Sequence, residues 1–273
     1  MALSVVDIYQ KILPKTNCKE CGHPTCLAFA GMVVSQKLPL KNCPYVDAAA
    51  LSRYQPELDE QHAAGKWTQR DMAADALKWA KERSADMALD ELPDRIGGDL
   101  QDTLKGPALA LPYFSGTILI RKDGIFKSDG SPLTRWEQVF VYNHMAQGGS
   151  RLPGEDWRGL EQFPNTISKQ KTMRAKVEQP LVARFRGQPA ALLRAAQAIG
   201  GQPLADPPSS ADVAVRLTPL PRIPVVLLFW DHAPADQLDA QAKLLFDATI
   251  SEHLDIESIL FLSERIKQLL LDE

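Results

Sequence analysis

The sequence predicts an α+β protein in two parts, a small, mainly helical module followed by a larger mixed α/β domain. Three observations lead to this prediction. The four cysteines of the 273-residue chain all lie in its first 43 residues, residues 51–106 are rich in charge and alanine, and strand and helix patterns then mix without a regular βαβ rhythm. We therefore expect a module over residues 1–52, a helical connector over residues 53–106 and the larger domain over residues 107–273.

Two short helices are expected to frame the cysteine-rich stretch. Ser4 opens a capping box for a helix that Pro14 closes. Thr25 can cap a second helix that extends to about Gln36, which places Cys26 in its first turn. The first helix then leads into the cysteines, and the second carries the third of them.

The remaining elements follow from hydrophobic periodicity. The connector is expected to be helical, with Met72, Ala76 and Trp79 on one side. A Lys-Asp-Gly turn predicts a hairpin, and the continuous apolar run at residues 225–230 is typical of a central strand. Strands are expected at residues 117–120, 125–126, 213–217 and 225–230, and helices at residues 132–147, 172–185, 190–199, 241–249 and 257–271.

The cysteines carry the strongest functional signal. Cys18, Cys21, Cys26 and Cys43 have the spacing C-x2-C-x4-C-x16-C. Four thiolates with none left over make one complete metal site. The spacing suits a 4Fe-4S cube, because the first three sulfurs come from one tight loop and the fourth returns from beyond a helix. We expect one such cluster, with these four cysteines as its ligands.

Two other uses of the cysteines remain open beside the cube. A zinc site made of four thiolates usually has two C-x2-C pairs, whereas sixteen residues separate the last two cysteines here. Disulfides need an oxidising compartment, but the N-terminus lacks the basic stretch and long apolar core of a secretory signal. The cube is therefore favoured, and the protein is expected to be cytoplasmic.

Composition and missing motifs exclude several classes of function. An apolar content of 45% and a formal net charge of −3 are typical of a soluble globular protein, and mild acidity gives no case for nucleic acid. No apolar run reaches the length of a membrane span. Neither a phosphate-binding loop nor a dinucleotide-binding glycine turn is present. We expect no nucleic-acid partner and no direct membrane insertion.

The N-terminal residues resemble a known module. The string from Thr16 to Ala30, closing with Cys43-Pro-Tyr45, is similar to the 4Fe-4S domain at the N-terminus of the corrinoid iron–sulfur protein large subunit, and to modules in the B subunit of the Rnf electron-transport complex. The resemblance covers about the first fifth of the chain. It implies that the matching cysteines bind the cube and that the protein transfers electrons to a redox partner, which could be corrinoid-dependent. The D-x-H-x-x-G signature of many corrinoid proteins is absent, so an embedded corrinoid is not expected.

The larger domain resembles an uncharacterised domain found behind such cluster modules in anaerobic bacteria and archaea. This resemblance implies the two-part architecture and an anaerobic setting, but no activity. The residues that carry it are Gly154, Trp157, Phe163-Pro164, Gly200-Gly201, the stretch from Leu220 to Trp230, and Leu245-Phe-Asp247.

Several side chains near the cysteines could adjust the cluster. His23 lies inside the loop and could donate a hydrogen bond to sulfur, although simple exposure is the favoured interpretation. Lys15, Lys19 and Lys41 could add a positive field, and an ordinary solvated role explains them equally well.

Polar groups elsewhere have a plain interpretation that is favoured over a functional one. Asp231 and His232 follow the expected central strand and could belong to a ligand site, but a loop turn is favoured. Glu252 and His253 could form an acid–base pair, but a polar approach to the last helix is favoured. Three aromatic residues could line an acceptor pocket, although core positions are favoured: Trp136, Trp157 and Trp230.

The expected function is that of a 4Fe-4S protein that transfers single electrons for a partner redox enzyme or corrinoid protein in anaerobic metabolism. The alternative is a structural or sensory cluster on a binding or assembly protein, because a cysteine loop can fold around a metal centre that does no redox chemistry. No catalytic residue is expected, and an enzyme fed by the cube ranks third.

Overall fold

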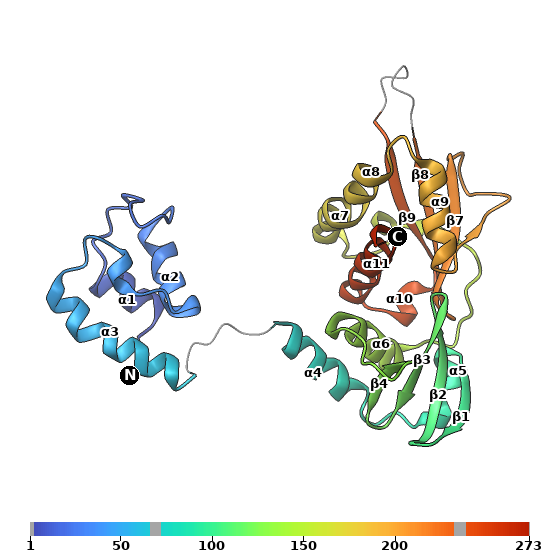
Figure 1. Ribbon diagram of the computed structural model, residues 1–273, viewed down its shortest axis with the longest axis horizontal. Helices are drawn as coiled ribbons and strands as arrows, with labels where there is room; N and C mark the ends of the chain where they lie inside the picture. Colours follow the sequence, from blue (N-terminus) through green and yellow to red (C-terminus); the bar gives the residue numbers. More distant parts are fainter. Residues whose placement is uncertain (1–2, 66–71, 232–238, 273) are drawn as a thin grey trace. The chain divides into compact units, whose positions relative to one another are not determined.

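The chain forms two compact units, each with its own hydrophobic core (Figure 1). The computed structural model describes residues 3–65, 72–231 and 239–272. Unit 1 spans Met1–Met72 and unit 2 spans Ala73–Glu273. Unit 1 is helical and unit 2 contains two sheets with helices, which confirms the α+β class. No helix in these ranges has both the length and the apolar character that crossing a membrane requires.

Unit 1 begins with the two helices that were expected around the cysteines. The Ser4 hydroxyl accepts a hydrogen bond from the Asp7 backbone at 3.1 Å, and the Thr25 hydroxyl accepts one from the Ala28 backbone at 3.0 Å, so both predicted caps are confirmed. The elements of unit 1 are α1 (Val5–Lys11), α2 (Cys26–Gln36), the 3-10 turn η1 (Leu40–Asn42) and α3 (Ala48–Ala63).

Helix α3 packs into the core of unit 1. Leu58 is fully buried there. The Gln61 side chain accepts a hydrogen bond from the Leu3 backbone N–H at 2.7 Å and donates one to the Leu3 carbonyl at 3.0 Å. The expected boundary at residue 52 falls inside this helix, so the expected connector over residues 53–106 is divided between the two units.

Unit 2 contains two antiparallel sheets. The first has the strand order β1-β2-β3-β4 and the second β5-β9-β8-β7-β6, so the apolar strand β8 is central, as predicted. The strands are β1 (Asp99–Thr103), β2 (Gly106–Tyr113), β3 (Gly116–Arg121), β4 (Gly124–Lys127), β5 (Trp157–Gly159), β6 (Gln202–Pro203), β7 (Val213–Leu220), β8 (Ile223–Trp230) and β9 (Gln241–Asp247).

The helices of unit 2 lie between and beside these sheets (Figure 1). In the second sheet, α8 packs on β9 and α9 on β7. The helical elements are α4 (Met72–Ser84), η2 (Leu89–Glu91), α5 (Leu92–Ile96), α6 (Arg135–Gln147), η3 (Leu160–Gln162), α7 (Ile167–Met173), the π-helical turn η4 (Arg174–Glu178), α8 (Gln179–Phe185), α9 (Pro189–Ala198), α10 (Ile250–His253) and α11 (Ile256–Leu271).

Two segments differ from the helical prediction. Residues 241–249 were expected to be a helix, but β9 occupies most of this range. Its even-numbered residues Ala242, Leu244 and Phe246 are buried, whereas Lys243 is only half-buried, and this period of two suits pairing with β8. Strand β1 lies within the expected connector, where Gly98 and its neighbour end the helical region and allow the chain to pair with β2.

Most other predicted elements of unit 2 are confirmed. The hairpin β3–β4 turns at Lys-Asp-Gly, with Gly124 at a φ of 145°. The helix expected at residues 172–185 begins earlier and runs from α7 through η4 to α8. The face predicted for the connector helix is wrong in one respect, because Trp79 is 65% exposed and Ala80 is buried instead.

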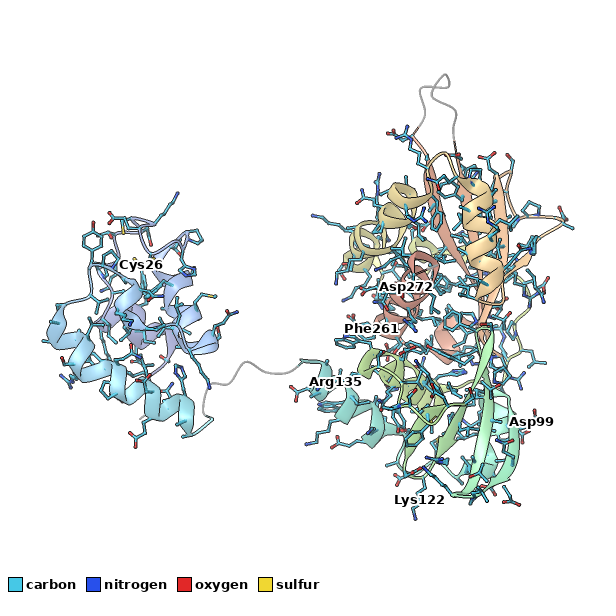
Figure 2. The ribbon with its side chains drawn as sticks, viewed as in Figure 1. Cys26, Asp99, Lys122, Arg135, Phe261 and Asp272 are labelled. Atoms are coloured by element: carbon cyan, nitrogen blue, oxygen red, sulfur yellow. The ribbon has the colours of Figure 1, made fainter. Side chains whose placement is uncertain are left out.

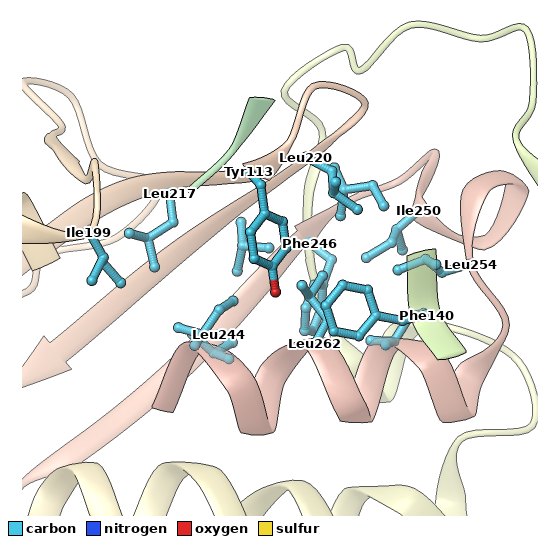
Figure 3. Close-up of a cluster of buried hydrophobic side chains, with 14 of the residues drawn as sticks. Tyr113, Phe140, Ile199, Leu217, Leu220, Leu244, Phe246, Ile250, Leu254 and Leu262 are labelled. Atoms are coloured by element: carbon cyan, nitrogen blue, oxygen red, sulfur yellow. The ribbon is translucent and has the colours of Figure 1, made fainter. Parts of the chain in front are cut away.

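A buried ionic network sits in the core of unit 2, close to the cluster of apolar side chains around Tyr113 and Phe140 (Figure 3). Glu137 is 1% exposed; its carboxylate accepts a hydrogen bond from the Tyr113 hydroxyl at 2.9 Å and pairs with Arg265 Nε at 2.8 Å. Burial raises the pKa of Glu137, but its bonds to Thr134, Arg265 and Tyr113 outweigh burial and leave the pKa lowered. The carboxylate therefore stays charged and joins β2, α6 and α11.

Candidate metal centre

The four cysteines are carried by the loop between α1 and α2, by the start of α2, and by the segment after η1. Cys18 and Cys21 lie in the loop, Cys26 is the first residue of α2 (Figure 2), and Cys43 directly follows η1. Cys26 and Cys43 are 6% and 5% exposed, Cys21 is half-buried, and Cys18 is exposed. The thiols therefore run from the core of unit 1 to its surface.

The backbone of the cysteine loop is tightly wound. Lys15, Asn17, Lys19 and Gly22 have φ angles of 61°, 50°, 66° and 81°. The Gly22 N–H closes a turn by donating to the Lys19 carbonyl at 2.9 Å. Left-handed backbone costs residues with a side chain about 1–2 kcal/mol each, so three of these positions are strained. Such strain persists where other interactions hold the loop in place, as metal ligation does.

Asn17 connects the loop to helix α2. Its side-chain oxygen accepts a hydrogen bond from the Cys26 backbone N–H at 2.8 Å. This N–H is one of the unpaired donors at the start of a helix, and Thr25 satisfies another. Asn17 directly precedes Cys18, so this hydrogen bond fixes the position of Cys26 relative to Cys18. The positive end of the α2 dipole also favours negative charge at Cys26.

The structure brings Cys43 into the electrostatic neighbourhood of the other three cysteines. The pKa of the Cys43 thiol is raised, first by burial and then by the negative charges of Cys21, Cys26 and Cys18, while a hydrogen bond from the Tyr45 backbone lowers it. A residue that follows α2 and η1 in sequence thus returns to the loop. Ligation by the four cysteines stays a prediction.

The donor set fits an iron–sulfur cube in its chemistry. Four thiols are present with buried and exposed members, one of them is on the first residue of helix α2, and the Tyr45 backbone N–H donates to the Cys43 sulfur. In a cube each cysteine binds a different iron, whereas in a zinc site four sulfurs lie about 2.3 Å from one ion. Within residues 3–65, 72–231 and 239–272, no three His, Cys, Asp or Glu side chains converge as ligands for a single metal ion.

Side chains at the edge of the site include a contact that sequence reasoning missed. The Tyr45 hydroxyl donates to the Glu20 carboxylate at 2.7 Å, which links the segment of the fourth cysteine to the turn between the first two. This bond raises the pKa of Tyr45. Tyr45 and Glu20 are 25 positions apart, so no local sequence pattern could predict their hydrogen bond. The asparagine directly before Cys18, in contrast, is a local signal from which the bond to Cys26 could have been predicted.

His23 and the lysines near the cysteines lie at the surface or close to it. The His23 ring is half-buried and its centroid is 5.7 Å from that of Phe29, which is itself fully buried. Lys15, Lys19 and Lys41 are exposed.

Among the residues that the structure describes, the polar candidates of unit 2 do not assemble a second site. His253 is fully buried; its Nε2 lies 3.0 Å from the Arg151 carbonyl and its Nδ1 lies 3.3 Å from the Gly149 N–H. Glu252 instead forms an ion pair with Arg151 at 2.7 Å. Both ring nitrogens of His253 are therefore occupied, and the residue lies at the end of α10, directly before the last helix.

The remaining candidates of unit 2 have structural partners. Asp231 accepts a hydrogen bond from the Gly187 backbone at 2.8 Å, and His232 lies outside the described residues. Trp136 is 39% exposed and stacks on Phe261 with centroids 4.3 Å apart. The core positions favoured for the three tryptophans are wrong, because Trp157 and Trp230 are only half-buried.

Two family models match the chain. The family described as "Putative Fe-S cluster" matches residues 13–45, and the family described as "Domain of unknown function (DUF3786)" matches residues 88–268. These matches correspond to the cysteine loop of unit 1 and to most of unit 2. They confirm both resemblances expected from the sequence, and the first supports an iron–sulfur cofactor.

Curated relatives match only the N-terminal part of the chain. The corrinoid/iron-sulfur protein large subunit of Moorella thermoacetica is 56% identical over 50 residues, which cover 18% of this chain and 11% of that protein. The gamma subunit of the acetyl-CoA decarbonylase/synthase complex of Methanocaldococcus jannaschii is 38% identical over 58 residues, or 21% of this chain and 12% of that subunit. The chain therefore matches about a tenth of the length of these relatives. No solved structure matches it.

Proposed function

The chain belongs to the family of the domain of unknown function DUF3786, and from this premise we propose that it is a one-electron transfer protein whose unit 1 binds one 4Fe-4S cluster. The observation that carries the proposal is the match of residues 13–45, which contain all four cysteines, to the family described as "Putative Fe-S cluster"; Cys26 and Cys43 are buried there and Cys18 is exposed. A site that reaches the surface on one side is open to a redox partner.

The residues of unit 1 have distinct roles in this proposal. Cys18, Cys21, Cys26 and Cys43 are the ligands. Asn17 holds the start of α2 against the loop. The Tyr45 backbone N–H points at Cys43, and hydrogen bonds to sulfur favour the more negative, reduced state. When bound, a 4Fe-4S cube supplies reversible one-electron chemistry, at a potential set by such hydrogen bonds, charge and exposure.

The proposed partner is a redox enzyme or corrinoid protein of anaerobic metabolism. This step is supported by the relatives, whose printed names describe a corrinoid/iron–sulfur subunit and subunits of acetyl-CoA decarbonylase/synthase complexes. We place the protein in the cytoplasm, where thiols stay reduced, and assign it neither a nucleic-acid partner nor direct membrane insertion.

The second candidate function is a structural or sensory cluster on a binding or assembly protein. One observation favours it, namely that Cys26 and Cys43 belong to the hydrophobic core of unit 1, so a metal centre there would also hold this core together. The two functions differ in whether the cluster changes redox state at a potential that a biological carrier reaches.

Anaerobic preparation followed by chemical analysis tests the cofactor. We expect about four irons and four sulfides per chain, the content of one cube. Stoichiometric zinc without sulfide would exclude it.

A redox titration followed by electron paramagnetic resonance tests the function. We expect a one-electron signal to appear when a low-potential donor such as reduced methyl viologen is added. If iron and sulfide are present at full content but no donor reduces the cluster, the structural candidate replaces electron transfer.

A further inference from the structure

Positive charge is concentrated around the cysteines of unit 1. Residues 11–43 contain five lysines and a single acidic residue, Glu20, although the whole chain has a formal net charge of −3. Three of the seven acidic residues of unit 1 lie on α3, at Glu57, Asp59 and Glu60. The charge of this unit is therefore separated along the chain, with its basic part around the expected ligands.

Three of the lysines are held near the cysteines by covalent geometry. Lys19 follows Cys18, Lys15 precedes Cys18 by three positions, and Lys41 precedes Cys43 by two. Because a chain extends at most about 3.6 Å per residue, their Cα atoms lie within about 4–11 Å of a ligand Cα atom. In the part of the chain that the structure describes, these three side chains are exposed and form no ion pair.

Glu20 offsets one unit of this positive charge. Its carboxylate accepts a hydrogen bond from the Tyr45 hydroxyl at 2.7 Å, which joins the turn between the first two cysteines to the segment after the fourth. It is the one acidic group among residues 11–43, and each neighbouring lysine remains available to a group outside the chain.

Two large side chains with apolar surface lie close to cysteines in sequence. Leu27 directly follows Cys26 and is 49% exposed, and Tyr45 follows Cys43 by two positions and is 53% exposed. Protein interfaces combine such apolar centres, often with tyrosine, and a charged edge that guides association. We call these five exposed residues, Lys15, Lys19, Leu27, Lys41 and Tyr45, the basic rim.

We propose that the basic rim docks a small acidic electron-carrier protein. The inference rests on the proposed electron transfer and names the partner's chemistry. One electron leaves the reduced carrier and enters the oxidised 4Fe-4S centre, with no bond made or broken and no proton moved. A cube with four thiolates is anionic and would by itself repel an acidic carrier, so the lysines supply the attraction that allows the two centres to approach.

The test compares two charge reversals of the same kind. Lys19→Glu removes a charge from the basic rim. Lys37→Glu makes the same change at the opposite end of α2, which is about 16 Å long for its 11 residues. Both lysines have left-handed backbone, with φ of 66° and 57°, so the backbone cost of the two substitutions is matched. Lys41→Glu serves as a second rim variant if Lys19→Glu fails to retain full iron content.

Binding is measured by anaerobic calorimetry of the cluster-loaded chain with a small acidic [2Fe-2S] ferredoxin, at 50 and 300 mM salt. We expect the wild-type affinity to fall about tenfold between these salt concentrations. At low salt, Lys19→Glu should weaken binding about tenfold and Lys37→Glu by less than about twofold.

The outcomes separate this inference from the proposed function. Reduction by methyl viologen requires no docking and reports the redox function alone. If viologen reduces the cluster but ferredoxin does not bind, or both variants bind equally, the inference is wrong and electron transfer stands. Salt-sensitive self-association without ferredoxin binding would assign the rim to a second copy of the chain. If viologen fails as well, the proposed function fails first.

Discussion

Asn17 fixes the geometry of the cysteine loop although it is not a ligand. Its side chain accepts from the Cys26 N–H at 2.8 Å, and its φ of 50° turns the chain into Cys18. Asparagine suits both tasks, because it tolerates left-handed backbone better than most residues and carries an acceptor close to its own backbone. The loop therefore depends on this residue for the relative position of two cysteines.

Replacing Asn17 by alanine should make the cluster labile. Asn17→Ala removes the hydrogen bond and leaves a side chain in left-handed backbone, at a cost of about 1–2 kcal/mol. We expect iron release to a ferrous chelator to become about 5- to 30-fold faster. Asn42→Ala is the control. Asn42 also directly precedes a cysteine, but its side chain forms no hydrogen bond with the residues that the structure describes. Equal release rates for the wild type and Asn17→Ala would contradict this role.

His144 in unit 2 is buried in an uncharged form. It is fully buried, its Nδ1 lies 3.1 Å from the His253 carbonyl, and its Nε2 has no partner within the described residues. Burial, followed by the charges of His253 and nearby arginines, lowers the pKa of His144 to about 3. In the unfolded chain, His144 binds a proton below about pH 6.5, whereas in the folded unit it stays neutral down to its lowered pKa. The contribution of His144 to the free energy of unfolding is therefore full above pH 6.5 and decreases as the pH falls toward the folded pKa.

The pH dependence of unit 2 should therefore be reduced by His144→Asn, whose amide can keep the bond to the His253 carbonyl. Between pH 7.5 and 5.5, we expect wild-type unfolding free energy to fall by about 1.4 kcal/mol from this group alone. In urea unfolding, the unfolding free energy of the variant should lack this decrease between pH 7.5 and 5.5. A smaller dependence of the unfolding free energy on pH should remain from His253, whose pKa is also lowered. His23→Asn, in unit 1, is the control. An unchanged slope in His144→Asn would be inconsistent with a neutral buried histidine.

At the site, the sequence predicted local features and missed distant ones. The spacing of Cys18, Cys21 and Cys26 follows from one loop and one helix cap, both of which are encoded by neighbouring residues. The bond between Tyr45 and Glu20 joins residues 25 positions apart and depends on how the chain returns after α2. A single sequence contains no signal for such a contact.

Among the elements, local capping and turn signals were reliable, whereas tertiary pairing overrode helix propensity. Helices α1 and α2 begin at the predicted caps because a hydroxyl next to free N–H groups acts within four residues. Residues 241–249 contain good helix formers, yet β9 forms there because β8 offers a complete strand partner and a buried face for Leu244 and Phe246. Propensity alone could not reveal that partner.

Helix α3 should be as important for the cluster as the cysteine loop. Leu58 of α3 is fully buried in the core that also contains Cys26 and Cys43. Leu58→Ala should destabilise unit 1 by about 2–5 kcal/mol and lower its iron content after purification. Trp79→Ala, in a helix that the sequence assigned to the same connector, removes an exposed side chain and should leave iron content unchanged. If Leu58→Ala keeps full iron content and stability, α3 is not part of the module.

At the scale of the whole molecule, the two units have separate cores. The core of unit 1 draws on α1, α2 and α3, and that of unit 2 on both sheets and their helices. The sequence indicated two parts because the cysteines stop at residue 43, but it placed the boundary at residue 52, inside α3. The charged composition of α3 concealed a buried stripe, of which Leu58 and Gln61 are members.

Loss of the cluster should therefore leave unit 2 intact. Cys26→Ala removes one of the four proposed ligands and should abolish iron binding, because the proposed cube needs all four thiolates for full retention. The urea midpoint of unit 2, followed by the fluorescence of its tryptophans, should change little, because the substitution touches only the core of unit 1. Collapse of both units in a single shifted transition would show that they fold together.

The division after Met72 also matters for the history of the gene. Since the two cores share no buried residue in the described part of the chain, recombination near this codon could replace, duplicate or remove one unit while the other unit still folds. The two units can thus evolve at different rates and can be joined to different domains.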